Sequence, residues 1–224
     1  MARTAALMGA SGLVGGHCLQ ALLAAPEWSR VVVLTRRELK LGMSARVEPK
    51  VADMGRLTAA DFAGVDDVFC ATGTTIRKAG SQEEFRRVDY EMPLGAARAA
   101  REAGARQFLI VSAAGADPES RNFYLRTKGE LDRELEKLGF AALHIFRPGL
   151  LLGHRQEYRP MERTATRLAP VMNLTLWGPL KRYRAISAET VGRAMVGAAK
   201  ANRTGINVYE YEEIFEARHR AESP

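Results

Sequence analysis

Three side chains in the second half of the chain have the types and spacing of a proton-transfer site. Tyr124 and Lys128 are four positions apart, and Ser112 lies twelve positions before the tyrosine. On a helix, the phenol and the ammonium would share one face. A phenol has an ordinary pKa near 10, and a nearby ammonium lowers that pKa because it favours the phenolate. If Ser112 bonds the substrate oxygen, Tyr124 could deliver a proton to a carbonyl as a nicotinamide delivers hydride.

The glycines near the start of the chain predict the cofactor site that this chemistry needs. Gly9, Gly12 and Gly15 form the pattern G-x-x-G-x-x-G, with an apolar run before it and a helical pattern after it. In that context Gly9 permits a tight turn, Gly12 lets the backbone approach a pyrophosphate, and Gly15 lets the helix pack closely. The amides at the helix start then face the phosphates.

Two arginines after the second apolar run favour NADP(H) over NAD(H). NAD-specific sites usually place an acidic residue about 20 residues beyond the glycines, to bind the ribose 2′-hydroxyl. Here the stretch reads Leu-Thr-Arg36-Arg37, with no carboxylate before Glu38. Guanidinium groups suit a 2′-phosphate because each can bond two phosphate oxygens. The alternative is a pair of solvated surface arginines.

A loop of small residues is expected beside the adenosine half of the cofactor. Ala71, Thr72 and Gly73 follow the predicted strand 67–70. They therefore lie at the carboxyl edge of the sheet, where ligands of open α/β folds bind. Asp53 could accept a hydrogen bond from the adenine amine, and a solvated loop carboxylate is an equal alternative.

Strands and helices alternate along the chain, which predicts a doubly wound α/β fold with a parallel sheet. Asp89 is expected to cap a helix that carries Pro93 in its first turn, and the mixed-charge tail from Glu210 is expected to be peripheral or frayed. The whole chain, 1–224, is interpreted as one NAD(P)-binding domain, with 150–190 on the substrate side. Predicted strands cover 5–8, 30–34, 47–51, 67–70, 107–111, 142–146 and 207–209, and predicted helices cover 13–25, 82–88, 89–104, 122–138 and 187–200.

Taken together, these motifs resemble the short-chain dehydrogenase/reductase superfamily. The turn 146–149, Phe-Arg-Pro-Gly, is similar to the R-P-G turn of its extended and atypical branches. The segments 73–75, 78–80, 128–130, 146–152 and 155–157 resemble one atypical branch, that of the human Tat-interactive protein and its bacterial relatives, over nearly the whole chain.

The resemblance implies a Rossmann domain that binds NADP(H). Related proteins often carry Ser-Ser where this chain has Ser112-Ala113, which weakens the assignment of Ser112 relative to Tyr124 and Lys128. The resemblance places the phosphates at Ser11, Gly12, Leu13 and Val14, the 2′-phosphate at Arg36 and Arg37, the ribose and nicotinamide at Tyr124 and Lys128, and further cofactor contacts at Leu150, Leu151 and Arg159.

Net charge and cysteine content limit the cellular compartments and binding partners that are expected for this chain. The 224 residues carry a net charge of +7, and seven of the cations lie in 155–184 against two acidic residues. This basic segment could contact an anionic small-molecule substrate, dock a protein partner or be a solvated face. No nucleic-acid recognition motif, membrane span or metal-ligand spacing is present in the sequence. Two cysteines without a C-x-x-C spacing and the lack of an apolar leader predict a cytoplasmic protein.

Two functions from different classes are consistent with these patterns. The first is an NADPH-dependent oxidoreductase that reduces a carbonyl through Tyr124, Lys128 and Ser112. The second is a regulatory or redox-sensing interaction protein that binds NADP(H) and turns over little, a reading that Ala113 leaves open. A dinucleotide epimerase is a weaker third reading, because Arg36 and Arg37 stand where an NAD-selective acid is expected.

Overall fold

Seven parallel strands form one sheet in the computed structural model, which describes residues 2–38, 44–153 and 176–222. The order across the sheet is β3-β2-β1-β4-β5-β6-β9, so β1 to β3 extend the sheet to one side and β4 onwards extend it to the other, as in doubly wound folds. The predicted fold class is confirmed. The strands are β1 (Arg3–Met8), β2 (Trp28–Thr35), β3 (Val47–Val51), β4 (Asp67–Cys70), β5 (Gln107–Val111), β6 (Ala142–Phe146) and β9 (Gly205–Tyr209).

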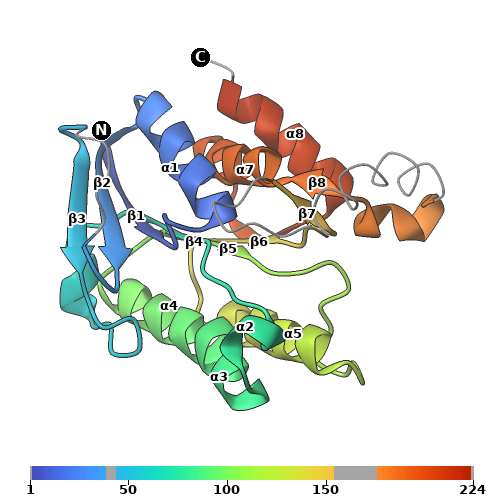
Figure 1. Ribbon diagram of the computed structural model, residues 1–224. Coiled ribbons are helices and arrows are strands. Elements are labelled where there is room, and N and C mark those ends of the chain that lie inside the picture. The colour runs from blue at the N-terminus through green and yellow to red at the C-terminus, as the bar shows by residue number, and fades with distance from the viewer. Residues whose placement is uncertain (1, 39–43, 154–175, 223–224) are drawn as a thin grey trace.

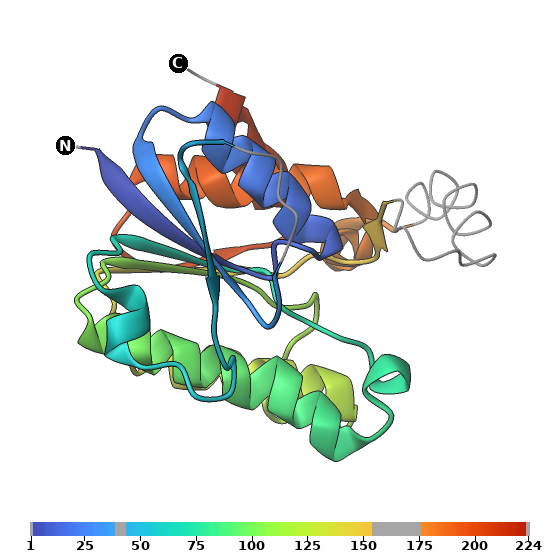
Figure 2. The same cartoon turned by 60° about the vertical axis from the view of Figure 1, so that its left-hand side comes forward.

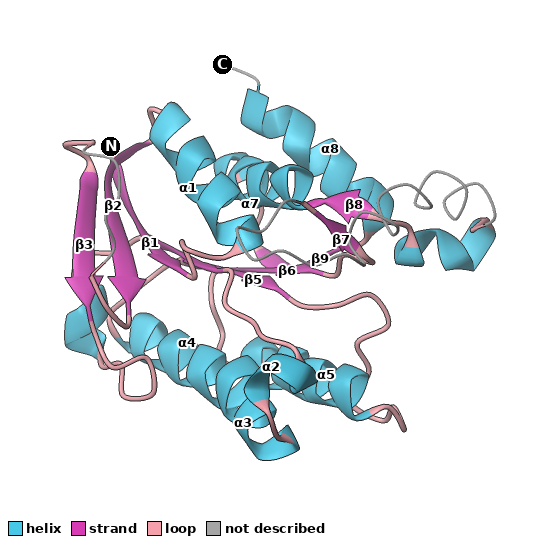
Figure 3. Cartoon of the chain, viewed as in Figure 1, coloured by secondary structure: helices cyan, strands magenta, loops and turns pink. Residues whose placement is uncertain are grey.

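Helices cover both faces of the sheet (Figure 1). One face carries α1 (Leu13–Ala24), α7 (Ala188–Ala201) and α8 (Tyr211–Glu222). The other carries α4 (Met92–Glu102) and α5 (Phe123–Glu136), with the short α2 (Ile76–Ala79) and α3 (Gln82–Arg86) on the same side (Figure 2). A small parallel pair, β7 (Leu151–Leu152) and β8 (Ile186–Ser187), stands apart from the main sheet (Figure 3).

Successive strand residues feed two separate cores, which explains the continuous apolar runs in the sequence. Leu7 and Val33 pack in the core under α1 and α7, while Met8 and Leu34 pack in the core under α4 and α5. Because side chains alternate across a strand, a strand buried on both faces needs an apolar residue at every position.

Residues 211–222 of the tail are helical, so the prediction of a frayed segment is wrong for this part of the chain. It forms α8, whose Ile214 and Ala217 are fully buried against α7. Charged residues lie between these apolar positions along the sequence, so the segment has a polar average composition. Burial of the one apolar face outweighs the average composition.

Asp89 is not an N-cap, contrary to prediction. A π-helical turn, η2 (Arg87–Glu91), joins α3 directly to α4, so the chain is helical from 82 to 102. The turn places the Asp89 carboxylate inside the protein at 1% exposure. Insertions of this kind in helices are frequent at functional sites. Pro93 does lie in the first turn of α4, as predicted.

A chain of buried polar side chains crosses the sheet on the α7 side. The Asp67 carboxylate accepts from Trp28 Nε1 at 2.7 Å and from Gln107 Nε2 at 2.9 Å. His144 Nε2 lies 3.1 Å from Gln107 Oε1, and His144 Nδ1 lies 2.9 Å from the Tyr209 hydroxyl. Because the Gln107 oxygen can only accept, Nε2 carries the ring hydrogen and Nδ1 accepts from the tyrosine. Five strands are thereby connected through side chains.

Candidate active site

The predicted tyrosine and lysine share one face of α5. Asn122 caps this helix, with its side-chain oxygen accepting from Leu125 N at 3.2 Å. Tyr124 packs its ring on the buried Phe85, with the centroids 5.6 Å apart. Lys128, one turn later, is buried, and its ammonium interacts electrostatically with the Tyr124 phenol. The helix and Phe85 thus hold the pair in the orientation that the spacing predicted.

Asp89 joins this pair, a role that the sequence did not reveal. Lys128 Nζ lies 2.7 Å from Asp89 Oδ1, and both side chains are buried. Burial alone would lower the pKa of Lys128, but Asp89 and Tyr124 outweigh it and raise the pKa above its ordinary value. Lys128 is therefore held charged. In the sequence, Asp89 is simply a carboxylate among residues with a helical pattern, and the same pattern is expected of an N-cap.

The same carboxylate holds the loop after β4. Asp89 Oδ2 accepts from Thr74 N at 2.8 Å, while Oδ1 pairs with Lys128. The loop that includes the predicted adenosine contacts Ala71, Thr72 and Gly73 is thus tied to the lysine through one side chain. A change at Asp89 is expected to affect both.

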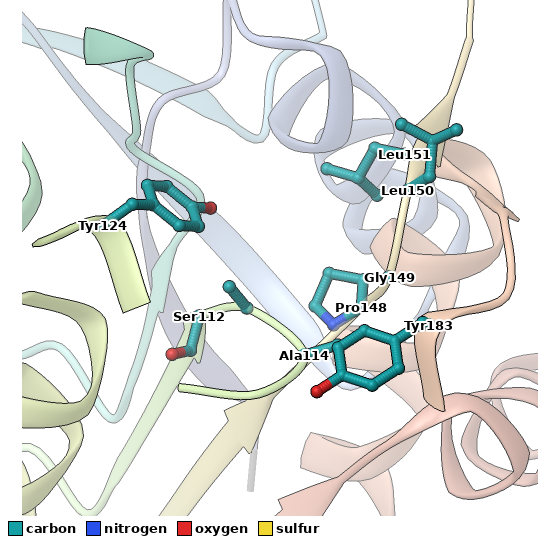
Figure 4. A pocket seen from close by; sticks show the side chains of 9 residues that line it. Ser112, Ala114, Tyr124, Pro148, Gly149, Leu150, Leu151 and Tyr183 are labelled. Atoms are coloured by element: carbon teal, nitrogen blue, oxygen red, sulfur yellow. The ribbon is translucent and has the colours of Figure 1, made fainter. Parts of the chain in front are cut away.

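Ser112 reaches the site from the end of β5, but its hydroxyl is engaged elsewhere. Ser112 Oγ donates to Asp132 Oδ2 at 3.0 Å, and Arg147 Nη2 lies 2.9 Å from the same oxygen. Burial raises the pKa of Asp132, with Arg147 and Ser112 opposing the shift. Figure 4 shows the serine hydroxyl turned away from the Tyr124 hydroxyl and from Pro148. The structure does not bring Ser112 Oγ together with the tyrosine.

The glycine turn has the geometry of a phosphate cradle. Gly9 has a φ of +85°, and a Cβ there would lie 2.6 Å from the Ala71 carbonyl oxygen. Gly12 N donates to Gly9 O at 2.8 Å, and α1 begins at Leu13 with no side-chain cap and no acidic residue in its first turn. Apart from the Gly12 amide, the amides at the start of α1 are therefore available to an anion, and Ser11 to Val14 fit the pyrophosphate of a dinucleotide.

The residues predicted around the adenosine end are less closely gathered. Arg36 and Arg37 are exposed and directly follow β2. Since β2 is the neighbour of β1 in the sheet, the two arginines follow the strand next to the one that leads into the glycine turn. Asp53 is exposed; its Oδ1 accepts from Gly55 N at 3.0 Å and its Oδ2 lies 3.9 Å from Arg56 Nε. That arrangement matches a solvated loop carboxylate. Arg159 lies outside the described residues.

A cavity of about 190 Å³ opens beside the Tyr124 ring. The lining comes from four parts of the chain: the end of β5, the start of α5 with Tyr124, the turn that follows β6, and η3 (Gly178–Tyr183). Leu150 and Leu151 line it, as does Tyr183, which the sequence did not single out (Figure 4). The lining residues are Ser112, Ala113, Ala114, Tyr124, Pro148, Gly149, Leu150, Leu151 and Tyr183.

Within the described residues, the protein has neither a membrane-spanning helix nor a cluster of metal ligands. None of the helices in 2–38, 44–153 and 176–222 is both long enough and apolar enough to span a bilayer. Within the same ranges, no cluster of three or more His, Cys, Asp or Glu side chains could hold a metal ion.

Comparison with known proteins assigns the family. A profile described as NAD(P)H-binding matches residues 9–202. The chain belongs to this NAD(P)H-binding family. Protein HTATIP2 of Rattus norvegicus is 41% identical to this NAD(P)H-binding protein over 160 residues, which are 70% of the chain and 66% of the relative. The resemblance to the Tat-interactive protein branch is confirmed.

Fungal relatives extend the match and correct one prediction. A mitochondrial protein named fmp52, from Emericella nidulans, is 34% identical over 201 residues, which are 86% of the chain and 85% of the relative. Because such relatives are named as mitochondrial, the predicted cytoplasmic location is wrong. Unpaired cysteines do not distinguish the cytosol from other reducing compartments.

Solved structures confirm the fold of this NAD(P)H-binding protein. MoeE5 in complex with UDP-glucuronic acid and NAD has a TM-score of 0.69 at 17% identity, covering 92% of this chain and 75% of that one. A double mutant of DesIV, a dTDP-glucose 4,6-dehydratase from Streptomyces venezuelae, has a TM-score of 0.71 at 17% identity, with 97% and 80% covered. The likeness shows a Rossmann fold, and the family profile assigns NAD(P)H binding to it.

Proposed function

We propose that the protein is an NADPH-dependent oxidoreductase of the short-chain dehydrogenase/reductase type that reduces a carbonyl. The observation that carries this is the position of Tyr124 and Lys128 on one face of α5, beside a cavity closed by Pro148–Leu151. In the proposal, residues 1–224 form one NAD(P)-binding domain, in which 150–190 lies on the substrate side.

Each residue of the pair has a distinct task. Tyr124 donates the proton to the substrate oxygen, and bound NADPH supplies the hydride. Lys128 is kept charged by Asp89, so its ammonium favours the phenolate that Tyr124 becomes. Ser112 keeps its hydrogen bond to Asp132, and it lines the cavity at the end of β5 without donating to the substrate. Polarisation of the substrate oxygen then falls to Tyr124.

A screen of carbonyl compounds with NADPH tests this chemistry. Tyr124→Phe keeps the ring on Phe85 but removes the proton donor, so kcat/KM is expected to fall by roughly 10²–10⁴-fold. Tyr211→Phe, on α8, is the matched control and should keep full activity. If Tyr124→Phe retains the wild-type rate, Tyr124 is not the proton donor.

Cofactor choice is tested separately by fluorescence titration. Arg36 and Arg37 are exposed, and in the sequence the first acidic residue after β2 is Glu38. The two arginines are proposed to bind the 2′-phosphate. We expect NADPH to bind more tightly than NADH. Changing both arginines to alanine should weaken NADPH binding roughly tenfold or more, with little effect on NADH. Tighter binding of NADH by the wild type would defeat this assignment.

A redox-sensing protein with little turnover is the second candidate. It is favoured by the engaged Ser112 hydroxyl and by Ala113 at the next position, since neither offers a second donor to a substrate oxygen. This function predicts tight NADPH binding without reduction of any carbonyl in the screen. It also predicts that NADPH and NADP⁺ give different protease-cleavage patterns, because a sensor must change its surface between the two states.

A further inference from the structure

We infer that the cavity beside Tyr124 takes an uncharged carbonyl compound with an apolar body, and that the Tyr183 ring is the wall against which that body packs. The inference rests on the proposed function. It narrows the substrate class, since the basic composition of 155–184 also allowed an anionic substrate.

The cavity lining itself has no charged side chain among the described residues. Its side-chain polar groups are the hydroxyls of Ser112, Tyr124 and Tyr183, and the remaining lining is alanine, glycine, proline and leucine. The Ser112 hydroxyl is already bonded to Asp132. A carboxylate moved from water into this lining would lose hydration without gaining a cation, whereas an apolar group would gain by leaving water.

Two cations next to lining residues, Lys128 and Arg147, are matched inside the protein. Lys128 is one helical turn from Tyr124, and its ammonium pairs with Asp89 at 2.7 Å. Arg147 immediately precedes Pro148, and its guanidinium turns to the Asp132 carboxylate, with Nε at 3.0 Å and Nη2 at 2.9 Å. Both acids are buried at 1% exposure. A negatively charged substrate would have to compete with these internal partners.

The cations next to Tyr183 in the sequence also contact groups within the chain. Lys181 Nζ lies 2.8 Å from Glu212 Oε1, and Arg182 Nη1 lies 3.9 Å from Glu210 Oε1. The Arg182 guanidinium carbon lies 5.2 Å from the centre of the Tyr183 ring, and its buried Nε has no hydrogen-bond partner among the described residues. Arg184 Nε donates to the Leu176 carbonyl at 2.9 Å. None of these three side chains lines the cavity, so the positive charge around η3 stays outside the lining.

Tyr183 is fixed as a wall by its contact with the loop after β5. An added Cβ at Gly115 would lie 2.8 Å from the Tyr183 hydroxyl oxygen and 3.3 Å from a ring carbon. The ring therefore lies directly on the Gly115 backbone, and Figure 4 shows it across the cavity from Tyr124, below Pro148. An aromatic face held in this way offers apolar contact area to a ligand.

Matched pairs of ligands test the charge preference by binding and by turnover. The aldehydes are 4-methylbenzaldehyde against 4-carboxybenzaldehyde and hexanal against 6-oxohexanoate. Calorimetry uses the corresponding alcohols on the NADPH-saturated protein, because NADPH cannot oxidise them. We expect the neutral member of each pair to bind at least roughly tenfold more tightly and to be reduced with a correspondingly higher kcat/KM. Equal or tighter binding of the carboxylates, or binding of neither member, overturns the inference.

The same experiment separates this inference from the proposed function. If the neutral alcohols bind as expected but no aldehyde is reduced, the oxidoreductase proposal fails and the ligand preference stands. If aldehydes are reduced but the carboxylated members are preferred, the oxidoreductase proposal stands and the inference fails.

Variants of Tyr183 test the wall. Tyr183→Ala should weaken binding of the neutral alcohols about fivefold or more while NADPH affinity stays within twofold, and Tyr183→Phe should lose much less because it keeps the ring. Val51→Ala, on the opposite edge of the sheet, is the control for both affinities. Equal losses in the alanine and phenylalanine variants, or no loss in either, would exclude the ring as the wall.

Discussion

Acidification is expected to destabilise the protein through the buried ring of His144. Burial, with Arg203 as a smaller contributor, lowers the pKa of His144 from 6.5 to about 4. The unfolded chain therefore takes up a proton on this ring at a higher pH than the folded chain does. Stability from the neutral ring is complete above about pH 6.5 and is lost as the pH falls from there towards 4.

The magnitude follows from the two pKa values. At pH 5 the unfolded ring is almost fully protonated and the folded ring is mostly neutral, so the expected loss relative to pH 7 is about 2 kcal/mol. Near pH 4 the loss approaches roughly 3 kcal/mol. Burial also raises the pKa values of Asp67 and Asp132, which gives contributions of opposite sign. These occur in the wild type and in a His144 variant alike, so they cancel in the comparison.

Urea unfolding at pH 7, 6 and 5 measures the effect in wild type and His144→Gln. The variant should be less stable at pH 7, by about 1–2 kcal/mol, because the Tyr209 hydroxyl loses its acceptor. Its stability should then depend less on pH than that of the wild type. Tyr209→Phe also removes that hydrogen bond but keeps the imidazole, so it should retain the wild-type dependence. Parallel curves for wild type and His144→Gln would refute the reasoning.

Three further predictions concern buried or closely packed residues. Asp89→Ala should cost about 3–5 kcal/mol in urea unfolding, since it leaves Lys128 buried without a counter-ion, and adding Lys128→Met should recover part of this loss. Ile214→Ala should cost about 2–5 kcal/mol, because the side chain is fully buried where α8 packs on α7; a loss below 0.5 kcal/mol would mean that α8 is not part of the cooperative fold. Gly9→Ala should weaken NADPH binding in a fluorescence titration and destabilise by about 1–3 kcal/mol, given the positive φ and the Ala71 carbonyl oxygen that would lie 2.6 Å away.

Local sequence patterns correctly predicted most strands of the sheet, the glycine turn and the shared helix face of Tyr124 and Lys128. The strands 47–51, 67–70, 107–111 and 142–146 have the predicted bounds. The last three are short, largely apolar runs between turn signals, whereas 47–51 is an edge strand with charged residues and a proline. The glycine turn and the Tyr124–Lys128 spacing are also local features, and each depends on residues within about two helical turns of one another.

The partners of the site residues were not predictable, since they lie far apart along the chain. Asp89 meets Lys128 only because a π-helical turn rotates it inward, and no spacing rule distinguishes that position from an N-cap. Ser112 has the right place on β5, but the orientation of its hydroxyl depends on Asp132. Tyr183 reaches the cavity through the pairing of β7 with β8, which two-residue strands do not announce in a sequence.

The β7–β8 pair also makes the cavity depend on two distant parts of the chain. Leu151 pairs with Ile186 and Leu152 with Ser187, so the turn after β6 and the residues that follow η3 are held next to each other and next to the cavity. Neither strand belongs to the main sheet. A substitution that disturbs this small pair would therefore change the approach to Tyr124 while the main sheet, which carries the glycine turn, stays intact.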